Sequence, residues 1–397
     1  MPFNNSGVAG PDKLKKLNNN ADSNFSDEDY KMWSDVGNKT TQTPTIETPK
    51  EIIEALKEKM WRRSHSLKSV ETLENAIKSF EKYLVSRNIT YQQSIQNPIE
   101  ILDGYTSWLD KNHAASTTRT YLNFAKKALK FLGAKIDSEE FKERVTLPKK
   151  RPFQDDKVTK DQIRRIILGL NHLGLKTLLM LMKDTQARPT ELLGLRVSDI
   201  NLSYDPPYLN IAAERAKNDL PRELFFTPET KGLLISYIKK KDKQAGDFLY
   251  LCSIDPLDEV AVQEEIETVN GTMRTTLRNL LAGHEFADMN EKVRQHGTMQ
   301  RYKLHIYSFK KFAFTVMADT LGEIAARAIK GDREYVLTYY RKNREERAAD
   351  YNKVTPKLSV FSNDVEPTAK EVIEAKIRSM DGDELAKLQE FLKAAKA

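Results

Sequence analysis

The sequence is poor in the residues that build disulfide-linked or metal-bound scaffolds. It has one cysteine, Cys252, and six histidines among 397 residues. A single cysteine excludes an intramolecular disulfide framework and fits a reducing compartment, and a structural zinc site is not expected from scattered histidines. No run approaches the roughly 18 apolar residues of a membrane-spanning helix, and the polar N-terminus has no signal-peptide core. We therefore expect a soluble, intracellular protein without a membrane segment or a bound metal.

Basic residues outnumber acidic ones. The chain has 64 Lys and Arg against 57 Asp and Glu, a formal net charge of +7 and a pI near 9.0. A positive balance favours a polyanionic partner, although it says nothing about the fold. The length allows two domains of ordinary size with additional tails.

The composition changes along the chain and predicts five parts. Residues 1–49 are polar and predict a disordered arm. Residues 50–144 have apolar positions at three- and four-residue spacing, which predicts four helices in a small bundle. Residues 145–158 read as a linker, because prolines bracket a basic triplet. Residues 159–361 form a second domain, and residues 362–397 predict a helical tail that docks on a neighbouring protomer or packs on its own chain.

Within the second domain, Thr159 is expected to cap a helix, with Gln162 completing a capping box. The apolar run at 175–182 predicts a buried helix, residues 208–213 and 222–227 predict a β-hairpin, and a helix follows over 228–241. We expect residues 270–297 to continue as helix. The acidic stretch 255–271 could not be assigned to an element of this domain and reads as an insertion or a partner surface. The charged residues 341–354 predict a solvated helix.

Residues 184–200, D-T-Q-A-R-P-T-E-L-L-G-L-R-V-S-D-I, place an arginine between two helices. Pro189 suits the first turn of the second helix, where a missing N–H costs nothing. Arg188 would then lie in the turn, with a planar guanidinium suited to binding a phosphate. The alternative interpretation is an ordinary loop arginine that pairs with Glu191.

This stretch resembles the first-arginine box of the tyrosine recombinase/integrase family, T-G-x-R-x-S-E-L-x-x-L-x-x-x-D-I. Gln186 and Thr190 depart from the family's glycine and serine. The resemblance implies a mainly α fold with a small antiparallel β-sheet. It further implies a SAM-like helical core-binding domain at 50–144 and a C-terminal tyrosine-recombinase catalytic domain at 159–361.

A second box of the family, H-x-L-R-H-x-x-A-T, is altered in residues 304–315, L-H-I-Y-S-F-K-K-F-A-F-T. Tyr307 stands at the first histidine, Lys310 at the arginine and Lys311 at the second histidine. Lys310 keeps a cation, but as a point charge without a bidentate fork. His305 is a rival for the missing imidazole. A set of the form R…Y-x-x-K…Y resembles integrases of archaea and their viruses.

The family also has a lysine in the hairpin turn, where Lys217 is the match and Arg215 a competitor. At the end of the domain Gly331 matches a turn, and Asp332 replaces the family's histidine or tryptophan. The spacing to the family's nucleophile favours Tyr340, with Tyr339 as the alternative. Two further tyrosines are less favoured: Tyr335 and Tyr351.

The resemblance implies a site-specific DNA recombinase that cuts and rejoins DNA through a 3′-phosphotyrosyl intermediate. Arg188 and Lys310 would hold the charge on the phosphate, with Glu191 in support, and Lys217 would protonate the leaving 5′ oxygen. No cofactor or metal is implied. The partner would be double-stranded DNA with a specific site, bound as a homotetramer by a protein that is a monomer or dimer when free.

The implied setting is integration or excision of a mobile element, in a cytoplasmic nucleoid or from a viral gene. Basic residues of the bundle and linker are expected to contact phosphates, and the candidates are Lys68, Arg119, Lys126, Lys149, Lys150 and Arg151. Two alternatives stay open: a DNA-binding relative without catalysis, and a type IB-like topoisomerase.

Overall fold

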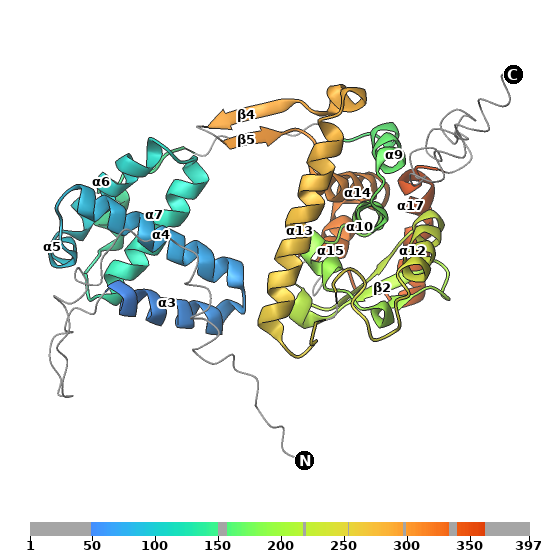
Figure 1. Cartoon of the computed structure of the whole chain (residues 1–397), viewed down its shortest axis with the longest axis horizontal. Helices are drawn as coiled ribbons and strands as arrows, with labels where there is room; N and C mark the ends of the chain where they lie inside the picture. The colour runs from blue at the N-terminus through green and yellow to red at the C-terminus, as the bar shows by residue number, and fades with distance from the viewer. Residues whose placement is uncertain are drawn as a thin grey trace, which may run out of the picture. The chain divides into compact units, whose positions relative to one another are not determined.

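The computed structural model describes residues 49–149, 157–216, 220–252, 254–296, 299–332 and 340–361. The chain divides into two compact units (Figure 1). One comprises Met1–Gln154 with Arg294–Gln300, and the other comprises Asp155–Val293 with Arg301–Ala397. The arm predicted for residues 1–49, apart from Pro49, and the helical tail predicted for 362–397 lie outside the described residues.

The first unit is helical over its described N-terminal part. The four predicted helices are present and two short ones accompany them, which the periodicity missed because six or seven residues complete too few turns. Their bounds are α3 Pro49–Ser64, α4 Leu67–Ser86, α5 Tyr91–Gln96, α6 Pro98–Asp110, α7 Ala115–Phe131 and α8 Ser138–Arg144.

Aromatic rings fill the centre of this bundle. The ring centroid of Tyr105 lies 5.0 Å from that of Phe80 and 5.4 Å from that of Tyr83. The Tyr105 hydroxyl donates to Ser79 at 3.0 Å. Helices α4 and α6 therefore share one aromatic core, in which edge-to-face and tilted pairs add to the burial of area.

The second unit begins with α9, Lys160–Gly169, and α10, Leu173–Thr185. Thr159 caps α9 and Gln162 returns the bond, so the predicted capping box is confirmed. Every residue from Leu178 to Thr185 is buried, as the apolar run predicted. The short helix α11, Pro189–Leu193, follows with Pro189 in its first turn.

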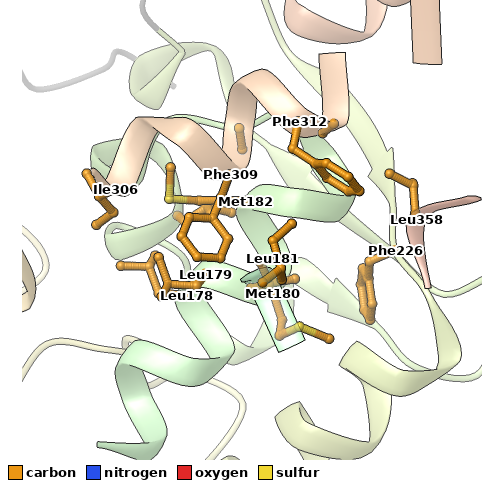
Figure 2. Packing of buried hydrophobic residues seen from close by; sticks show 14 of the residues in the cluster. Leu178, Leu179, Met180, Leu181, Met182, Phe226, Ile306, Phe309, Phe312 and Leu358 are labelled. Carbon is orange, nitrogen blue, oxygen red and sulfur yellow. The ribbon is translucent and has the colours of Figure 1, made fainter. Parts of the chain in front are cut away.

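Helix α10 is the centre of the second unit. Figure 2 shows its leucines and methionines against Ile306, Phe309 and Phe312 of α14, Ile306–Leu321. Phe226 and Leu358 close the same cluster from other segments. A helix that is apolar on all sides needs partners all round it, and α10 has them.

A three-stranded antiparallel sheet follows α11. Strands β2, Tyr208–Ile211, and β3, Arg222–Phe225, form the predicted hairpin, with Tyr208 paired to Phe225 and Ile211 paired to Arg222. The first strand, β1 Ile200–Asn201, has only two residues and was not predicted. The mainly α fold with a small antiparallel sheet is thus confirmed.

The remaining helices belong to the second unit, and two further strands form a separate hairpin. They are α12 Pro228–Lys240, α13 Glu259–Leu281, the 3₁₀ helix η4 His284–Met289, β4 Lys292–His296, β5 Met299–Tyr302, α14, α15 Glu323–Lys330 and α17 Arg344–Leu358. Strands β4 and β5 pair as a two-stranded sheet.

Two expectations for these elements are wrong. Residues 270–297 do not stay helical, because α13 ends at Leu281 and β4 begins at Lys292. The acidic stretch 255–271 is largely the first half of α13, which is mostly half-buried and packs on the core through Ile266. Helix α17 is not solvated on all sides, since Tyr351, Val354 and Leu358 are buried. Its charges lie between these positions and concealed a one-sided apolar face.

A buried ion pair connects three helices of the second unit. The Lys183 ammonium lies 2.5 Å from Asp184 and 2.8 Å from Glu229, and it donates to the carbonyl of Leu358 at 3.0 Å. The second oxygen of Asp184 accepts bonds from the hydroxyls of Thr227 and Thr230. The ends of α10, α12 and α17 therefore meet at one satisfied group of charges.

Replacing Lys183 is expected to destabilise the second unit strongly. Lys183→Ala would leave Asp184 buried without its cation, and loss of one partner of a buried pair typically costs about 3–5 kcal/mol. Urea unfolding of the DNA-free chain measures the effect. The matched control is Lys142→Ala, which removes an exposed pair with Glu139 and should cost less than about 1 kcal/mol. Equal losses in the two variants would contradict this prediction.

Candidate active site

Arg188 lies at the N-terminus of α11, in the turn that the sequence predicted. Its backbone N–H donates to Glu191 at 2.7 Å, and its guanidinium contacts the other oxygen of the same carboxylate at 3.0 Å. The side chain of Arg188 is 21 % exposed, whereas that of Glu191 is 2 % exposed. Both interpretations of this arginine are therefore partly met, because it pairs with Glu191 and still reaches the surface.

A second guanidinium shares Glu191, and it was missed. Arg222, the first residue of β3, donates to Glu191 at 2.8 Å and is 6 % exposed. The only sequence signal was a basic residue at the start of a mostly apolar strand, which does not identify its partner. Burial raises the pKa of Glu191, but Arg222 and both donors of Arg188 outweigh it, and the pKa lies below its ordinary value.

Lys310 joins this group from α14. Its ammonium donates to the backbone carbonyl of Gln186, two residues before Arg188. Gln186 ends α10 in the left-handed conformation, with φ 56°. Glycine adopts this conformation without strain, which explains why the family's box has glycine here. The first and second boxes therefore meet in space, as the resemblance implied.

The charge of Lys310 is strongly disfavoured in this setting. Burial is the largest cause that lowers its pKa to about 7, and the positive charge of Arg188 acts in the same direction against the opposing effect of Glu191. Arg222 and Lys330 lower it further. Lys310 thus titrates near neutrality, unlike the permanently charged arginine at this position in the family.

A cleft opens beside Lys310. It has a volume of about 470 Å³ and its lining includes Tyr307, Lys310 and Lys311 of α14. Two lysines from outside the second box, Lys157 and Lys330, complete its basic wall. Burial lowers the pKa of Lys311. Several ammonium groups around one opening form a surface suited to a polyanion.

Tyr340 lines a cavity that Arg222 also lines. The cavity has a volume of about 110 Å³, and Glu223 and Arg347 line it too. Its hydroxyl lies 3.4 Å from Asp350 on α17, a long contact, and Asp350 also binds Lys342. Burial raises the pKa of Tyr340, and Asp350 raises it further. The phenol holds its proton firmly in this arrangement.

The other predicted residues differ in what the structure says of them. Lys217 and Tyr339, like Tyr335, Lys150 and Arg151, lie outside the described residues. Arg215 pairs with Asp199 at 2.8 Å and donates to the carbonyl of Gly194. Tyr351 is buried in the core, with its hydroxyl 3.4 Å from the carbonyl of Asp184.

His305 and Asp332 have local partners. His305 precedes α14, and its Nδ1 lies 2.8 Å from the hydroxyl of Ser308. Asp332 follows the left-handed turn at Gly331 and pairs with Lys330 at 2.7 Å. Asp332 therefore acts on the cleft through a lysine that lines it.

The candidate DNA contacts of the first unit are partly engaged within it. Lys68 pairs with Glu71 at 2.7 Å, and the Arg119 Nε donates to the carbonyl of Pro148 at 3.1 Å. The ammonium of Lys126 lies 3.4 Å from the ring centroid of Phe141. Lys149 is exposed.

The part of the chain that the structure describes has neither a cluster of metal ligands nor a membrane-spanning helix. No group of three or more His, Cys, Asp or Glu side chains there is arranged to hold a metal ion. No helix there has the length and apolar character needed to cross a bilayer.

Lys310 is expected to make stability depend on pH. With a folded pKa near 7 and an unfolded value near 10.5, only the unfolded chain holds this proton between the two values. The free energy of unfolding should then rise with pH across that window, by at most about 1.4 kcal/mol per unit.

Lys310→Met removes this contribution, so its stability advantage over the wild type should shrink between pH 7 and 9. Urea unfolding of both proteins at several pH values measures the difference. A constant difference would mean that Lys310 is an ordinary lysine.

Comparison with known proteins gives one sequence relative. No model of a known protein family matches the chain. Tyrosine recombinase XerA of Saccharolobus solfataricus is 29 % identical over 185 residues, which are 46 % of this chain and 57 % of that protein. The match thus spans little more than half the length of this curated relative.

Solved structures give weaker similarities. The XerH site-specific recombinase bound to its difH substrate has a TM-score of 0.48 at 14 % identity, over 75 % of this chain and 83 % of that one. The XerA recombinase crystal structure has a TM-score of 0.33 at 16 % identity, over 77 % and 98 %. The chain is thus similar in sequence to a tyrosine recombinase over 185 residues, and residues 184–200 resemble the first-arginine box of the tyrosine recombinase/integrase family.

Proposed function

We propose that this protein is a site-specific DNA recombinase that acts through a tyrosine nucleophile. The observation that carries the proposal is the meeting of Arg188, Arg222 and Lys310 around the single carboxylate of Glu191. Three basic side chains around one acid leave an excess of positive charge, and a phosphodiester is the anion that such a group suits.

In the proposed reaction the oxygen of Tyr340, or of Tyr339, attacks the scissile phosphorus. The bond from phosphorus to the 5′ oxygen breaks, Lys217 protonates that oxygen, and the phenol proton passes to water. The 5′ hydroxyl of a partner strand then attacks the phosphorus and returns its proton to Lys217, while the bond from phosphorus to the tyrosine oxygen breaks and that oxygen takes a proton from water. Because most of the barrier in phosphoryl transfer is positioning and charge, the cations carry most of the catalysis.

The lysine-lined cleft supports a DNA partner for the same site. Its ammonium groups border Lys310, so phosphates next to the scissile one would find donors there. Helix α7 and the residues after α8 offer further cations, including Lys149. We extend the proposal to a homotetramer on paired sites of a mobile element, as a relative of the archaeal type. The XerA relative comes from an archaeon, Saccharolobus solfataricus.

One observation favours a DNA-binding relative without catalysis. The phenol of Tyr340 faces Asp350, and both burial and that carboxylate raise its pKa. A nucleophilic phenol needs the opposite environment. A catalytic protein must therefore release Tyr340 from Asp350 when DNA binds, or use Tyr339.

A DNA duplex with a nick next to the cleavage site tests the reaction, because the short product diffuses away and traps the covalent intermediate. We expect a protein–DNA adduct with the wild type, mapped by mass spectrometry to Tyr340 or Tyr339. Single Tyr→Phe variants at the two positions identify which phenol reacts. Binding without an adduct would support the non-catalytic relative, and adducts on any sequence with loss of supercoils would support a topoisomerase.

Arg188→Ala should lower the rate of adduct formation by about 10²–10³-fold, which is the typical loss for one donor to a developing oxyanion. The matched control is Arg165→Ala, which removes a guanidinium paired with Asp288. Single-turnover rates at saturating DNA separate catalysis from binding. A normal rate for Arg188→Ala would place the phosphate elsewhere.

A further inference from the structure

The buried guanidinium of Arg222 has one hydrogen-bond partner and one nitrogen without a partner. One Nη donates to Glu191 at 2.8 Å, while its Nε has no hydrogen-bond partner. A buried donor without a partner costs roughly 1–3 kcal/mol. A residue that retains such a cost within a charged site is more typical of function than of stability.

Gly331 provides the space for this guanidinium. A Cβ at Gly331 would lie 2.6 Å from Nη1 of Arg222, and the residue has φ +89°. The turn after α15 therefore packs directly on the arginine. Arg222 and Tyr340 also line the same 110 Å³ cavity.

Arg222 also influences Lys310. The positive charge of Arg222 is one of the causes that lower the pKa of Lys310, after burial and Arg188, while the negative charge of Glu191 opposes them. Arg222 also shares Glu191 with Arg188. One side chain from the β-hairpin thus acts on both basic residues of the two family boxes.

We propose that Arg222 is a positioning residue of this site, which fixes the Arg188 guanidinium through the Glu191 carboxylate that the two arginines share. The role rests on the proposed function, because it matters for DNA cleavage only if Arg188 and Lys310 bind the scissile phosphate. Arg222 supplies a second rigid guanidinium in a site where Lys310 stands at the arginine position of the second box. A lysine at position 222 could not replace Arg222 fully, since an ammonium lacks the planar fork.

Two variants test the proposal in the full-length chain. Arg222→Gln removes the charge, and Arg222→Lys keeps the charge without the fork. Competitive acetylation with mass-spectrometric detection gives the titration midpoint of Lys310 in the DNA-free protein. Removing a positive neighbour should move this midpoint to higher pH in Arg222→Gln and leave it near the wild-type value in Arg222→Lys.

Adduct formation on the nicked duplex gives the second readout. We expect both variants to lose roughly tenfold or more in single-turnover rate, with DNA dissociation constants close to the wild type. Because Arg222→Gln removes one partner of a buried ion pair, its urea midpoint should fall, so rates are compared under conditions in which each variant is fully folded. In Arg222→Gln the pH dependence of the rate should shift in the same direction as the Lys310 midpoint. The control, Arg165→Gln, should change neither the rate nor the midpoint.

A wild-type rate and an unmoved Lys310 midpoint in Arg222→Gln would overturn the proposal. A lower rate that follows only from weaker DNA binding or from unfolding would overturn it as well. If the wild type formed no adduct on any duplex, the proposed function would fail. The acetylation experiment would still decide whether Arg222 controls Lys310.

Discussion

The site depends on one buried carboxylate. Glu191 accepts bonds from the backbone and guanidinium of Arg188 and from the guanidinium of Arg222. Without this anion the two arginines and Lys310 would repel one another in a setting where water screens little. With it, they are held together and retain a net positive charge. The carboxylate thus makes it possible to collect cations before any DNA is present.

The surrounding helices hold this group through a second set of charges. Lys183 and Asp184 lie in the last turn of α10, just before the turn that contains Gln186 and Arg188. Glu229 of α12 binds Lys183 and also accepts the backbone N–H groups of Val360 and Phe361 after α17. The turn that presents Arg188 is therefore anchored from behind by α12 and α17, independently of its contacts at the surface.

Much of this arrangement was predictable from sequence, and the reasons are local. The apolar run of α10, the proline at the start of α11 and the capping box of α9 each specify their element within a few residues. The family boxes predicted Arg188, Glu191 and Lys310 in one site, and the structure brings these three side chains near one another, while their roles stay predictions. The positions of Lys217 and Tyr339 stay predictions.

The features that the sequence did not predict have other causes. Arg222 belongs to the site only because β3 pairs with β2 and brings its first residue beside α11, a relation that no spacing in the sequence encodes. Strands β4 and β5 have a polar composition, so no alternating apolar pattern predicted them, and their pairing with each other defines them. Helix α17 misled for the opposite reason, as its many charges hid an apolar face.

The contact between Lys310 and the carbonyl of Gln186 means that the ammonium has an acceptor within the protein itself. A left-handed residue turns that carbonyl toward the ammonium, so the backbone imitates the oxygen of an incoming phosphate. Under the proposed function, a DNA phosphate would have to exchange with this carbonyl before it engages the lysine. Cleavage would then start with a small rearrangement, and a duplex that binds in the wrong register would leave the lysine where it rests.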